Sequence, residues 1–390
     1  MRSRARPWRV RAEPALCLAL LLLGYVTTAQ AIPPPERLAA LQHGINLTNW
    51  FRFPASLDPA RLRGYLSDAQ IGDLRRAGFD FVRLAVQPEF LRDGDRADPL
   101  RVSLLLEAIH RLQRQGLAVT IAPHFSDRAV DRAGLLGFWR VLAPALAGSD
   151  PKWIFPEILN EPVFAQDAAG WAALQALVLA EIRQTLPRHT LIVTGQDWGS
   201  IAGLLALRPV ADANVIYSVH FYDPPELTSL AAYRPGLDRA ALARLPFPMA
   251  EGCDQTGAPT GANTDQATAE LIGFVCAMHW DAAGVGRRIG EAGAWARRHQ
   301  AAVLLGEFGA SVRLNAPARL AWLTAVRAAA EQAGIGWALW GYDDGMGLNV
   351  PHSPGLRPVL DEAVLRALGI GDHAVSDAPA PARSPRRSAR

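Results

Sequence analysis

The chain has 390 residues, of which 50% are apolar, so it can bury a large core and is not a fibrous or a fully disordered protein. Its formal charge of +3 comes from its ends: residues 1–31 carry five arginines and one glutamate, and residues 371–390 carry four arginines and two aspartates. Without those ends the body, residues 32–370, carries −3, which argues against nucleic acid as a partner.

The first 31 residues have the layout of a signal peptide. Their arginines precede an apolar stretch from Ala15 to Val26, and Ala29-Gln30-Ala31 supplies small residues for a signal peptidase. An uncleaved anchor is the alternative, but about 12 apolar residues fall short of the roughly 20 that span a bilayer, so no stable membrane insertion is expected. We therefore predict cleavage after Ala31 and an exported protein, either periplasmic or extracellular.

Short apolar runs alternate with longer segments of helical pattern along the body of the chain. The runs predicted as strands are His43 to Thr48, Phe79 to Ala85, Leu117 to Pro123, Trp153 to Asn160, Thr190 to Gly195, Asn214 to His220, Ala301 to Gly306 and Ile335 to Gly341. The segments predicted as helices are Ser67 to Ala77, Val102 to Gln115, Ala133 to Leu146, Ala168 to Thr185, Val285 to His299, Ala316 to Gln332 and Val359 to Leu368. Ser67 and Gln70 have the spacing of a capping box.

Strands that read as continuous apolar runs and alternate with helices predict a parallel sheet that is covered by helices. Eight such units predict an α/β fold, a (β/α)8 TIM barrel that forms a single domain over residues 32–370. An open doubly wound sheet is the alternative. That fold usually carries a glycine-rich phosphate-binding turn after its first strand, and this sequence has none there.

The interval between the sixth and seventh predicted strands is much longer than the others and must hold an excursion. Its part from Gly252 to Cys276 is rich in Gly, Thr and Asn. In an exported protein the pair Cys253 and Cys276 favours a disulfide over two free, buried thiols. Residues 371–390 are Pro, Ala, Ser and Arg without apolar periodicity, and we expect a disordered tail there.

Two glutamates follow two of the predicted strands. Glu161 ends the fourth strand within the sequence Asn160-Glu161-Pro162, and Glu307 ends the seventh. Splitting a glycosidic bond needs one carboxyl group that donates a proton to the departing oxygen and a second that attacks or shields the anomeric carbon. Because the carboxyl ends of barrel strands share one rim, we expect the two side chains to meet there.

The other predicted strands also present polar or aromatic side chains where they end. These are Asn46, Thr48, Asn49 and Trp50 on the first, Arg83 on the second, His124 after the third, Gln196, Asp197 and Trp198 after the fifth, His220 and Tyr222 on the sixth, and Trp340 and Tyr342 on the eighth. A single such residue is a weak signal, since a lone arginine is more often part of a structural ion pair. Eight strand ends that converge on one rim indicate a site.

This ordered set resembles glycoside hydrolase family 5, the cellulase-type family. The motifs are Gly44-Ile45-Asn46, Phe81-Val82-Arg83-Leu84, His124, Leu159-Asn160-Glu161-Pro162, His220-Phe221-Tyr222, Gly306-Glu307-Phe308-Gly309 and Trp340. The resemblance covers nearly everything from Gly44 to Trp340. It implies that Glu161 is the acid/base, that Glu307 is the nucleophile and that the anomeric configuration is retained.

The residue types suggest how such a pair would work. Two carboxyl groups that are close together resist ionising together, so we expect one of them to be charged and the other to hold a proton. Arg83 and a hydrogen bond from Tyr222 would keep Glu307 ionised, which leaves the proton on Glu161. Asn160 is placed to hydrogen-bond the sugar 2-hydroxyl, a contact that strengthens in the transition state.

The remaining polar and aromatic residues would hold the sugar. His124 and His220 are expected to fix it in the cleft and to orient the carboxylates. Trp340 is the expected platform nearest the cut, with Trp50 and Trp198 as outer candidates, because the apolar face of a pyranose lies flat on an indole ring. The tryptophans that lie in helical patterns are expected to pack in the core: Trp139, Trp171, Trp295 and Trp322.

The leading interpretation is a monomeric endo-β-1,4-glucanase that needs no cofactor or metal and acts on a polysaccharide or oligosaccharide. A β-mannanase or an exo-acting β-glucosidase or glucanase is the alternative on the same scaffold, although His124-Phe125-Ser126-Asp127 lacks the Gly-Ala-Pro-Gly turn of the family's exo-1,3-glucanases. A non-catalytic carbohydrate-binding barrel would keep the aromatic residues and lose one glutamate. A metal hydrolase is disfavoured because no His-x-His pair or His-Glu-x-x-His helix is present.

Overall fold

The computed structural model describes residues 33–93, 96–125, 131–164, 167–249, 253, 264–350 and 358–371. The predicted signal, residues 1–31, lies outside these ranges. So do residues 372–390 of the predicted tail and the Ser126-Asp127 part of the turn after His124.

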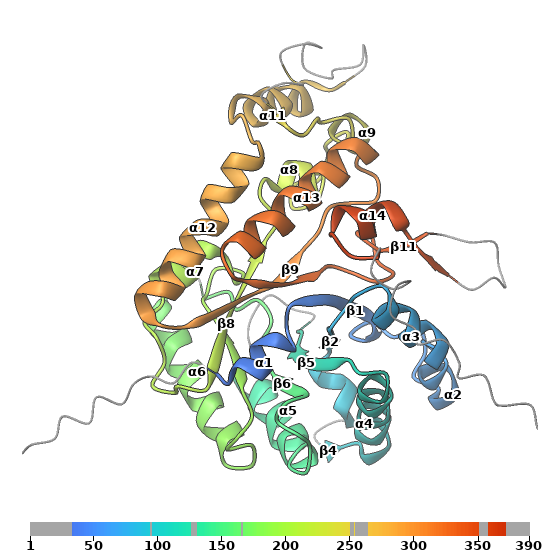
Figure 1. Cartoon of the computed structure of the whole chain (residues 1–390), viewed down its shortest axis with the longest axis vertical. Coiled ribbons are helices and arrows are strands. Elements are labelled where there is room, and N and C mark those ends of the chain that lie inside the picture. The colour runs from blue at the N-terminus through green and yellow to red at the C-terminus, as the bar shows by residue number, and fades with distance from the viewer. Residues whose placement is uncertain are drawn as a thin grey trace, which may run out of the picture.

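Eight parallel strands form a nearly closed barrel (Figure 1). They are β1 (His43–Phe51), β2 (Phe81–Val86), β5 (Ala118–Pro123), β6 (Ile154–Pro156), β7 (Leu191–Thr194), β8 (Val215–Phe221), β9 (Ala302–Phe308) and β10 (Gly336–Leu339). Their order around the barrel is β6-β5-β2-β1-β10-β9-β8-β7, and a parallel bridge between Glu157 and Ile192 brings β6 to β7. All eight predicted strands are present, and the predicted TIM barrel is confirmed.

Helices cover the outside of the strands (Figure 1). They are α1 (Pro35–Ala39), α2 (Pro59–Arg63), α3 (Asp68–Arg76), α4 (Pro99–Arg114), α5 (Arg132–Ala145), α6 (Ala168–Arg183), α7 (Ile201–Ala206), α8 (Pro225–Thr228), α9 (Arg239–Leu242), α11 (Gln266–Ala277), α12 (Ala282–His299), α13 (Ala316–Gln332) and α14 (Glu362–Ala367), with a 3-10 turn η1 at Pro88–Leu91. At α3 the Ser67 side chain accepts the N–H of Gln70 and completes the predicted capping box. Within the described ranges, no helix combines the length and the apolarity that crossing a bilayer requires.

The predicted helix from Val359 to Leu368 is wrong in its first turn. Val359–Leu360 is the short strand β12, which pairs antiparallel with β11 (Asn349–Val350). The helix begins after Asp361 because that side chain accepts the N–H groups of Ala363 and Val364 and so caps α14. A second small pair, β3 (Arg92–Asp93) and β4 (Arg96–Ala97), follows η1.

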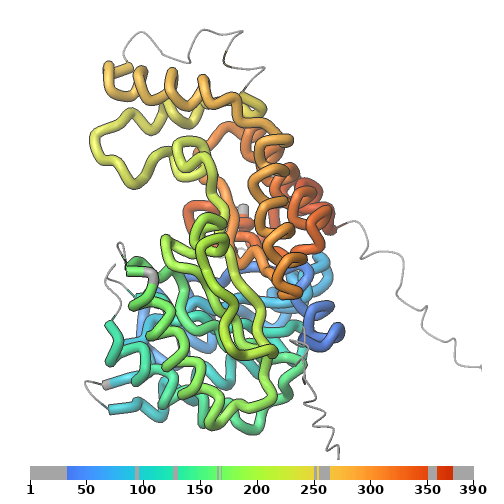
Figure 2. The backbone as a smooth tube through the Cα atoms, turned by 90° about the vertical axis from the view of Figure 1, so that its left-hand side faces the viewer, coloured from blue at the N-terminus to red at the C-terminus, as the bar shows by residue number. Residues whose placement is uncertain are grey.

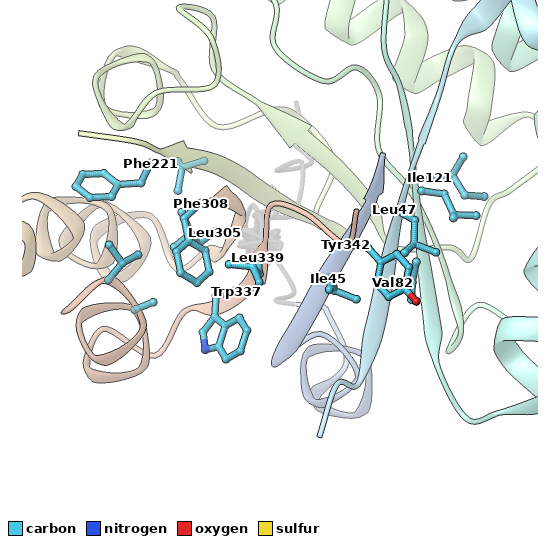
Figure 3. Close-up of a cluster of buried hydrophobic side chains, with 14 of the residues drawn as sticks. Ile45, Leu47, Val82, Ile121, Phe221, Leu305, Phe308, Trp337, Leu339 and Tyr342 are labelled. Atoms are coloured by element: carbon cyan, nitrogen blue, oxygen red, sulfur yellow. The ribbon is translucent and has the colours of Figure 1, made fainter. Parts of the chain in front are cut away.

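Alternation along the strands separates the barrel interior from the helix-facing core. The inner layer takes one side chain from most strands: Leu41, Phe81, Ala118, Phe155, Ile192, Ile216, Leu304 and Ala338. Gly44 leaves room for this layer, since a Cβ there would lie 2.2 Å from the Phe81 ring. The next position on the outer face, Val82, belongs instead to the large cluster between strands and helices, which Figure 3 shows in part. Arg83, two residues beyond Phe81, therefore points into the barrel above the apolar layer.

In its described part, the long excursion between β8 and α12 contains α8, α9 and α11. Figures 1 and 2 show α9 and α11 together at the upper end of the molecule. A disulfide joins Cys253 to Cys276, as predicted. The backbone N–H and the side-chain Nδ2 of Asn315 both donate to the carbonyl of Ala243, which ties the excursion to the loop that follows β9. The excursion therefore borders the rim on the side of Glu307.

Candidate active site

Strand register brings the polar side chains of the rim together. Asn46 on β1 lies beside Arg83 on β2, and His220 on β8 lies beside Glu307 on β9. Because neighbouring parallel strands are about 4.8 Å apart, residues in register can touch directly. The predicted convergence of strand ends is therefore present as contacts.

Arg83 is the centre of the polar network. Its side chain has no exposed surface, and all five of its N–H groups are used. Two go to Glu157 at 2.7 Å each, one to Glu307 at 2.5 Å, one to Asn46 at 2.9 Å and one to Asn160 at 2.8 Å. Burial opposes its charge, but Glu157 and Glu307 outweigh burial and raise the pKa of Arg83, so the guanidinium stays positive.

Both carboxylate oxygens of Glu307 accept hydrogen bonds. Arg83 donates to Oε1, and the Tyr222 hydroxyl donates to Oε2 at 2.9 Å, so both predicted contacts are present. Burial and then the charge of Glu307 raise the pKa of Tyr222 well above its ordinary value, so the phenol remains a donor. Two donors therefore fix the position of a carboxylate that is 3% exposed.

Glu161 faces Glu307 across a short gap. Its side chain is more open, at 24% exposed, and Nδ1 of His220 lies 2.9 Å from its Oε1. The same nitrogen lies 3.4 Å from Oε2 of Glu307, so His220 contacts both carboxylates, as expected. Burial disfavours the charged imidazole, yet the charge of Glu307 and the hydrogen bond to Glu161 outweigh it and raise the pKa of His220.

His124 takes only part of its predicted role. Within the described ranges, neither of its ring nitrogens has a hydrogen-bond partner, so it orients neither carboxylate. Its ring stacks instead on Trp340, with centroids 5.9 Å apart. Burial, together with the positive charges of Arg83 and Arg52, holds the pKa of His124 well below its ordinary value. A neutral imidazole with two unpartnered nitrogens is suited to binding sugar hydroxyls.

The three proposed aromatic platforms differ in exposure. Trp340 is half-buried at the rim, and Trp198 is 42% exposed. Trp198 also lies in a turn with positive φ at Asp197 and Trp198, an uncommon conformation that its N–H bond to the carbonyl of Pro162 helps to hold. Trp50 was predicted wrongly: it is 1% exposed, and its indole N–H donates to the carbonyl of Leu62, so it packs in the core. The four tryptophans in helices are buried, as predicted: Trp139, Trp171, Trp295 and Trp322.

Sequence reasoning missed Glu157. It is fully buried, three residues before Asn160, and binds Arg83 with both oxygens. A carboxylate inside an otherwise apolar strand was the signal, because a buried charge requires a partner of opposite sign. Asn46 is predicted only as a rim residue, but its side chain also links Arg83 to the neighbouring strands. Its oxygen accepts from Arg83, and its Nδ2 donates to the carbonyls of Gly306 and Leu339.

Three possible metal ligands meet in the site. One atom each from Glu161, His220 and Glu307 lies within 4.8 Å of the others. Both oxygens of Glu307 already accept hydrogen bonds, and one of them lies 2.5 Å from the guanidinium of Arg83. A cation at this position would face that fixed positive charge, so the donor set fits a carboxylate pair better than a metal centre.

A family model described as cellulase (glycosyl hydrolase family 5) matches residues 43–345. The chain belongs to this family. The match runs from the first residue of β1 to the loop that follows Trp340, and therefore includes every rim residue described above. Endoglucanase 3 of Fibrobacter succinogenes is 25% identical over 359 residues, which cover 85% of this chain and 53% of that protein. Endoglucanase C of Acetivibrio thermocellus is 22% identical over 204 residues, or 48% of this chain and 59% of that protein.

The chain thus spans a little over half the length of these two curated relatives. Among solved structures, endoglucanase Cel5A from Thermotoga maritima is similar with a TM-score of 0.69 and 22% identity, covering 86% of this chain and all of that one. The cellulose synthase subunit Z from Clostridioides difficile is similar with a TM-score of 0.64 and 23% identity, covering 84% of this chain and 99% of that one. These likenesses show that this cellulase-family chain shares their fold.

Proposed function

We propose that the chain is an exported, retaining glycoside hydrolase that cleaves β-1,4-glucan internally. The observation that carries this proposal is the distance between two carboxyl groups: an oxygen of Glu161 and an oxygen of Glu307 lie within 4.8 Å of each other. Retaining glycosidases hold their carboxyl groups about 5–5.5 Å apart, whereas inverting enzymes need about 6.5–9.5 Å to admit a water molecule. The short separation supports double displacement.

In the first step Glu307 attacks the anomeric carbon while the bond to the leaving oxygen breaks. Glu161 gives its proton to that oxygen, and a covalent ester forms between the sugar and Glu307. Arg83 and Tyr222 fix the attacking carboxylate, and esterification removes its negative charge. Glu161 then takes a proton from water, the water oxygen attacks the anomeric carbon, and Glu307 leaves as a carboxylate.

His220 and Asn160 support these steps from fixed positions. The contact between Nδ1 of His220 and Glu161 can stabilise the negative charge that Glu161 acquires when it gives up its proton. Arg83 holds the side-chain oxygen of Asn160, which fixes the amide so that its N–H groups are available to the sugar 2-hydroxyl. Such a contact strengthens as charge develops at the anomeric carbon.

Internal cleavage of β-1,4-glucan is supported by the similarity to endoglucanases, and export by the signal-like residues 1–31. A β-mannanase or an exo-acting glucosidase on the same scaffold would use the same two glutamates. Digestion of cellulose, mixed-linkage β-glucan, mannan and xylan, with product sizes followed over time, separates these activities. We expect a range of intermediate β-glucan oligosaccharides early in the reaction. Release of single sugars alone, or cleavage of mannan alone, would contradict the endoglucanase assignment.

The acid/base role is tested with two leaving groups. Glu161→Ala should abolish polysaccharide cleavage yet preserve the first step on an aryl glycoside with an acidic phenol, because such a phenolate leaves without a proton. An equal loss on both substrates would count against this role. A non-catalytic sugar-binding barrel predicts that the unaltered chain cleaves neither substrate.

A further inference from the structure

Arg52 stands out at the rim because its guanidinium has aromatic neighbours and, among the described residues, no polar partner. It directly follows β1, and its Cζ lies 4.6 Å from the ring centroid of Phe53 and 5.4 Å from that of Trp340. In the described part of the chain it makes no hydrogen bond or ion pair, and its Nε is buried without a partner. A buried donor that is left unpaired costs free energy, so a ligand that pairs it would be favoured.

The two arginines of the site differ in what they can still bind. Arg83 has all five donors engaged within the protein and two carboxylates beside it, so it has nothing left for a substrate. Burial and the nearby arginines keep the pKa of His124 low, so its ring adds no positive charge. Arg52 is therefore the cation beside Trp340 that retains open donors.

Arg52 contacts one aromatic ring of the catalytic site and another that lines a neighbouring cavity. Trp340 stacks on His124 in the catalytic site, while Phe53, the second aromatic neighbour of Arg52, is 52% exposed and lines a cavity of about 370 Å³. Asn49, Tyr65, Asp343 and Arg61 also line this cavity, so it offers both aromatic and polar surface. A sugar unit next to the one on Trp340 would lie within reach of Arg52.

We propose that Arg52 binds a carboxylate carried by a sugar unit next to the cleavage point, so that the enzyme prefers a uronate-bearing β-glucan to a neutral one. The planar guanidinium presents paired donors that match the two oxygens of a carboxylate, while its faces remain on the aromatic rings. Neutral hydroxyls would accept weaker hydrogen bonds from the same guanidinium, because only one of the two partners would be charged. This inference rests on the proposed function, since it names the substrate class of the same site.

The test compares cello-oligosaccharides with matched oligosaccharides in which one glucose is oxidised at C6 to a uronic acid. The measured quantity is the ratio of kcat/KM on the oxidised substrate to kcat/KM on the neutral one. Charge-assisted hydrogen bonds predict that Arg52→Gln lowers this ratio about tenfold to a hundredfold. Arg52→Lys should restore part of it, and added salt should reduce the preference of the unaltered enzyme.

Arg61→Gln is the matched control, because it removes one positive charge from the cavity that Phe53 lines, at a residue of α2 rather than at the arginine beside Trp340. A ratio that falls equally in both variants would mean that only the general charge of the rim acts, and would overturn the inference. Equal losses on both substrates in Arg52→Gln would do the same, because they indicate that Arg52 merely supports Trp340. The inference would also be overturned if the unaltered enzyme showed no preference for the oxidised substrate.

A binding measurement distinguishes failure of this inference from failure of the proposed function. The affinity of Glu161→Gln for the oxidised and neutral oligosaccharides can be measured with and without Arg52→Gln, and it requires no turnover. If the unaltered enzyme cleaves neither substrate while the binding preference depends on Arg52, the proposed function fails and the carboxylate-binding role of Arg52 stands. If both substrates are cleaved and binding shows no preference, the inference fails and the proposed function stands.

Discussion

Glu157 offers the sharpest test of how the site is held together. It does not face the gap between the two proposed catalytic glutamates, yet it binds two of the five donors of Arg83 at 2.7 Å each, and its side chain is 1% exposed. In Glu157→Gln, one oxygen becomes an N–H donor that points at a guanidinium N–H. One buried charge then loses a carboxylate partner and one hydrogen bond.

The size of the effect follows from burial. Removing one partner of a buried ion pair costs about 3–5 kcal/mol, because it leaves an uncompensated charge away from water. The chain offers a matched control in Glu107, which pairs with Arg63 at 2.8 Å, similarly close, with side chains 42% and 48% exposed. Exposed pairs of this kind contribute about 0–1 kcal/mol. Glu157→Gln should therefore lower the free energy of unfolding several times more than Glu107→Gln.

Urea unfolding followed by tryptophan fluorescence measures the stability of both variants, because the barrel contains many buried tryptophans. We expect the midpoint to fall in Glu157→Gln with little change in slope, and to stay near that of the unaltered protein in Glu107→Gln. Equal midpoints for the two variants would refute the reasoning, since Arg83 would then be satisfied by Glu307, Asn46 and Asn160 alone.

Three further predictions follow from the same structure. Glu307→Gln should abolish covalent trapping by a 2-fluoro sugar, seen by mass spectrometry, and labelling of another residue would refute its role as nucleophile. The raised pKa of His220 means that its charged form stabilises the folded state below about pH 6.5 and that this stability is lost as pH rises through the raised value. The difference in unfolding free energy between the unaltered protein and His220→Gln should accordingly shrink as pH rises from 6.5, and a difference that grows would contradict the direction of the shift. Replacing Cys253 and Cys276 by serine opens a loop of sequence separation 23, which should cost about 3 kcal/mol and lower the Tm, whereas an unchanged Tm would show that the excursion needs no crosslink.

Much of the site was readable from the sequence because barrel strands deliver their last residues to one rim. Glu161, Glu307, Arg83 and His220 were each identified from the end of an apolar run, and the structure brings all four together. Tyr222 was predicted to donate to Glu307, and it does so. Local pattern and strand alternation were enough to predict these positions.

The errors arose where the local pattern does not report burial. Trp50 follows the first predicted strand and Trp340 lies near the end of the eighth, yet α2 covers Trp50 and supplies the carbonyl of Leu62 to its indole N–H. The last helix was predicted to begin too early, because apolar Val359 fits a helix as well as it fits the short pairing of β12 with β11. Neither outcome can be decided without knowing what packs against the residue.

The order of residue types along the chain thus determined the eight strands, the parallel barrel and the pair of carboxylates, because period-2 and period-3.6 patterns are properties of neighbouring residues. Only the tertiary structure decided which partner each charge has. It placed Glu157 against Arg83 and left Arg52 between Phe53 and Trp340 without a polar partner in the described ranges. Electrostatic pairing depends on distances across strands that are remote in sequence, and those distances exist only once the barrel has closed.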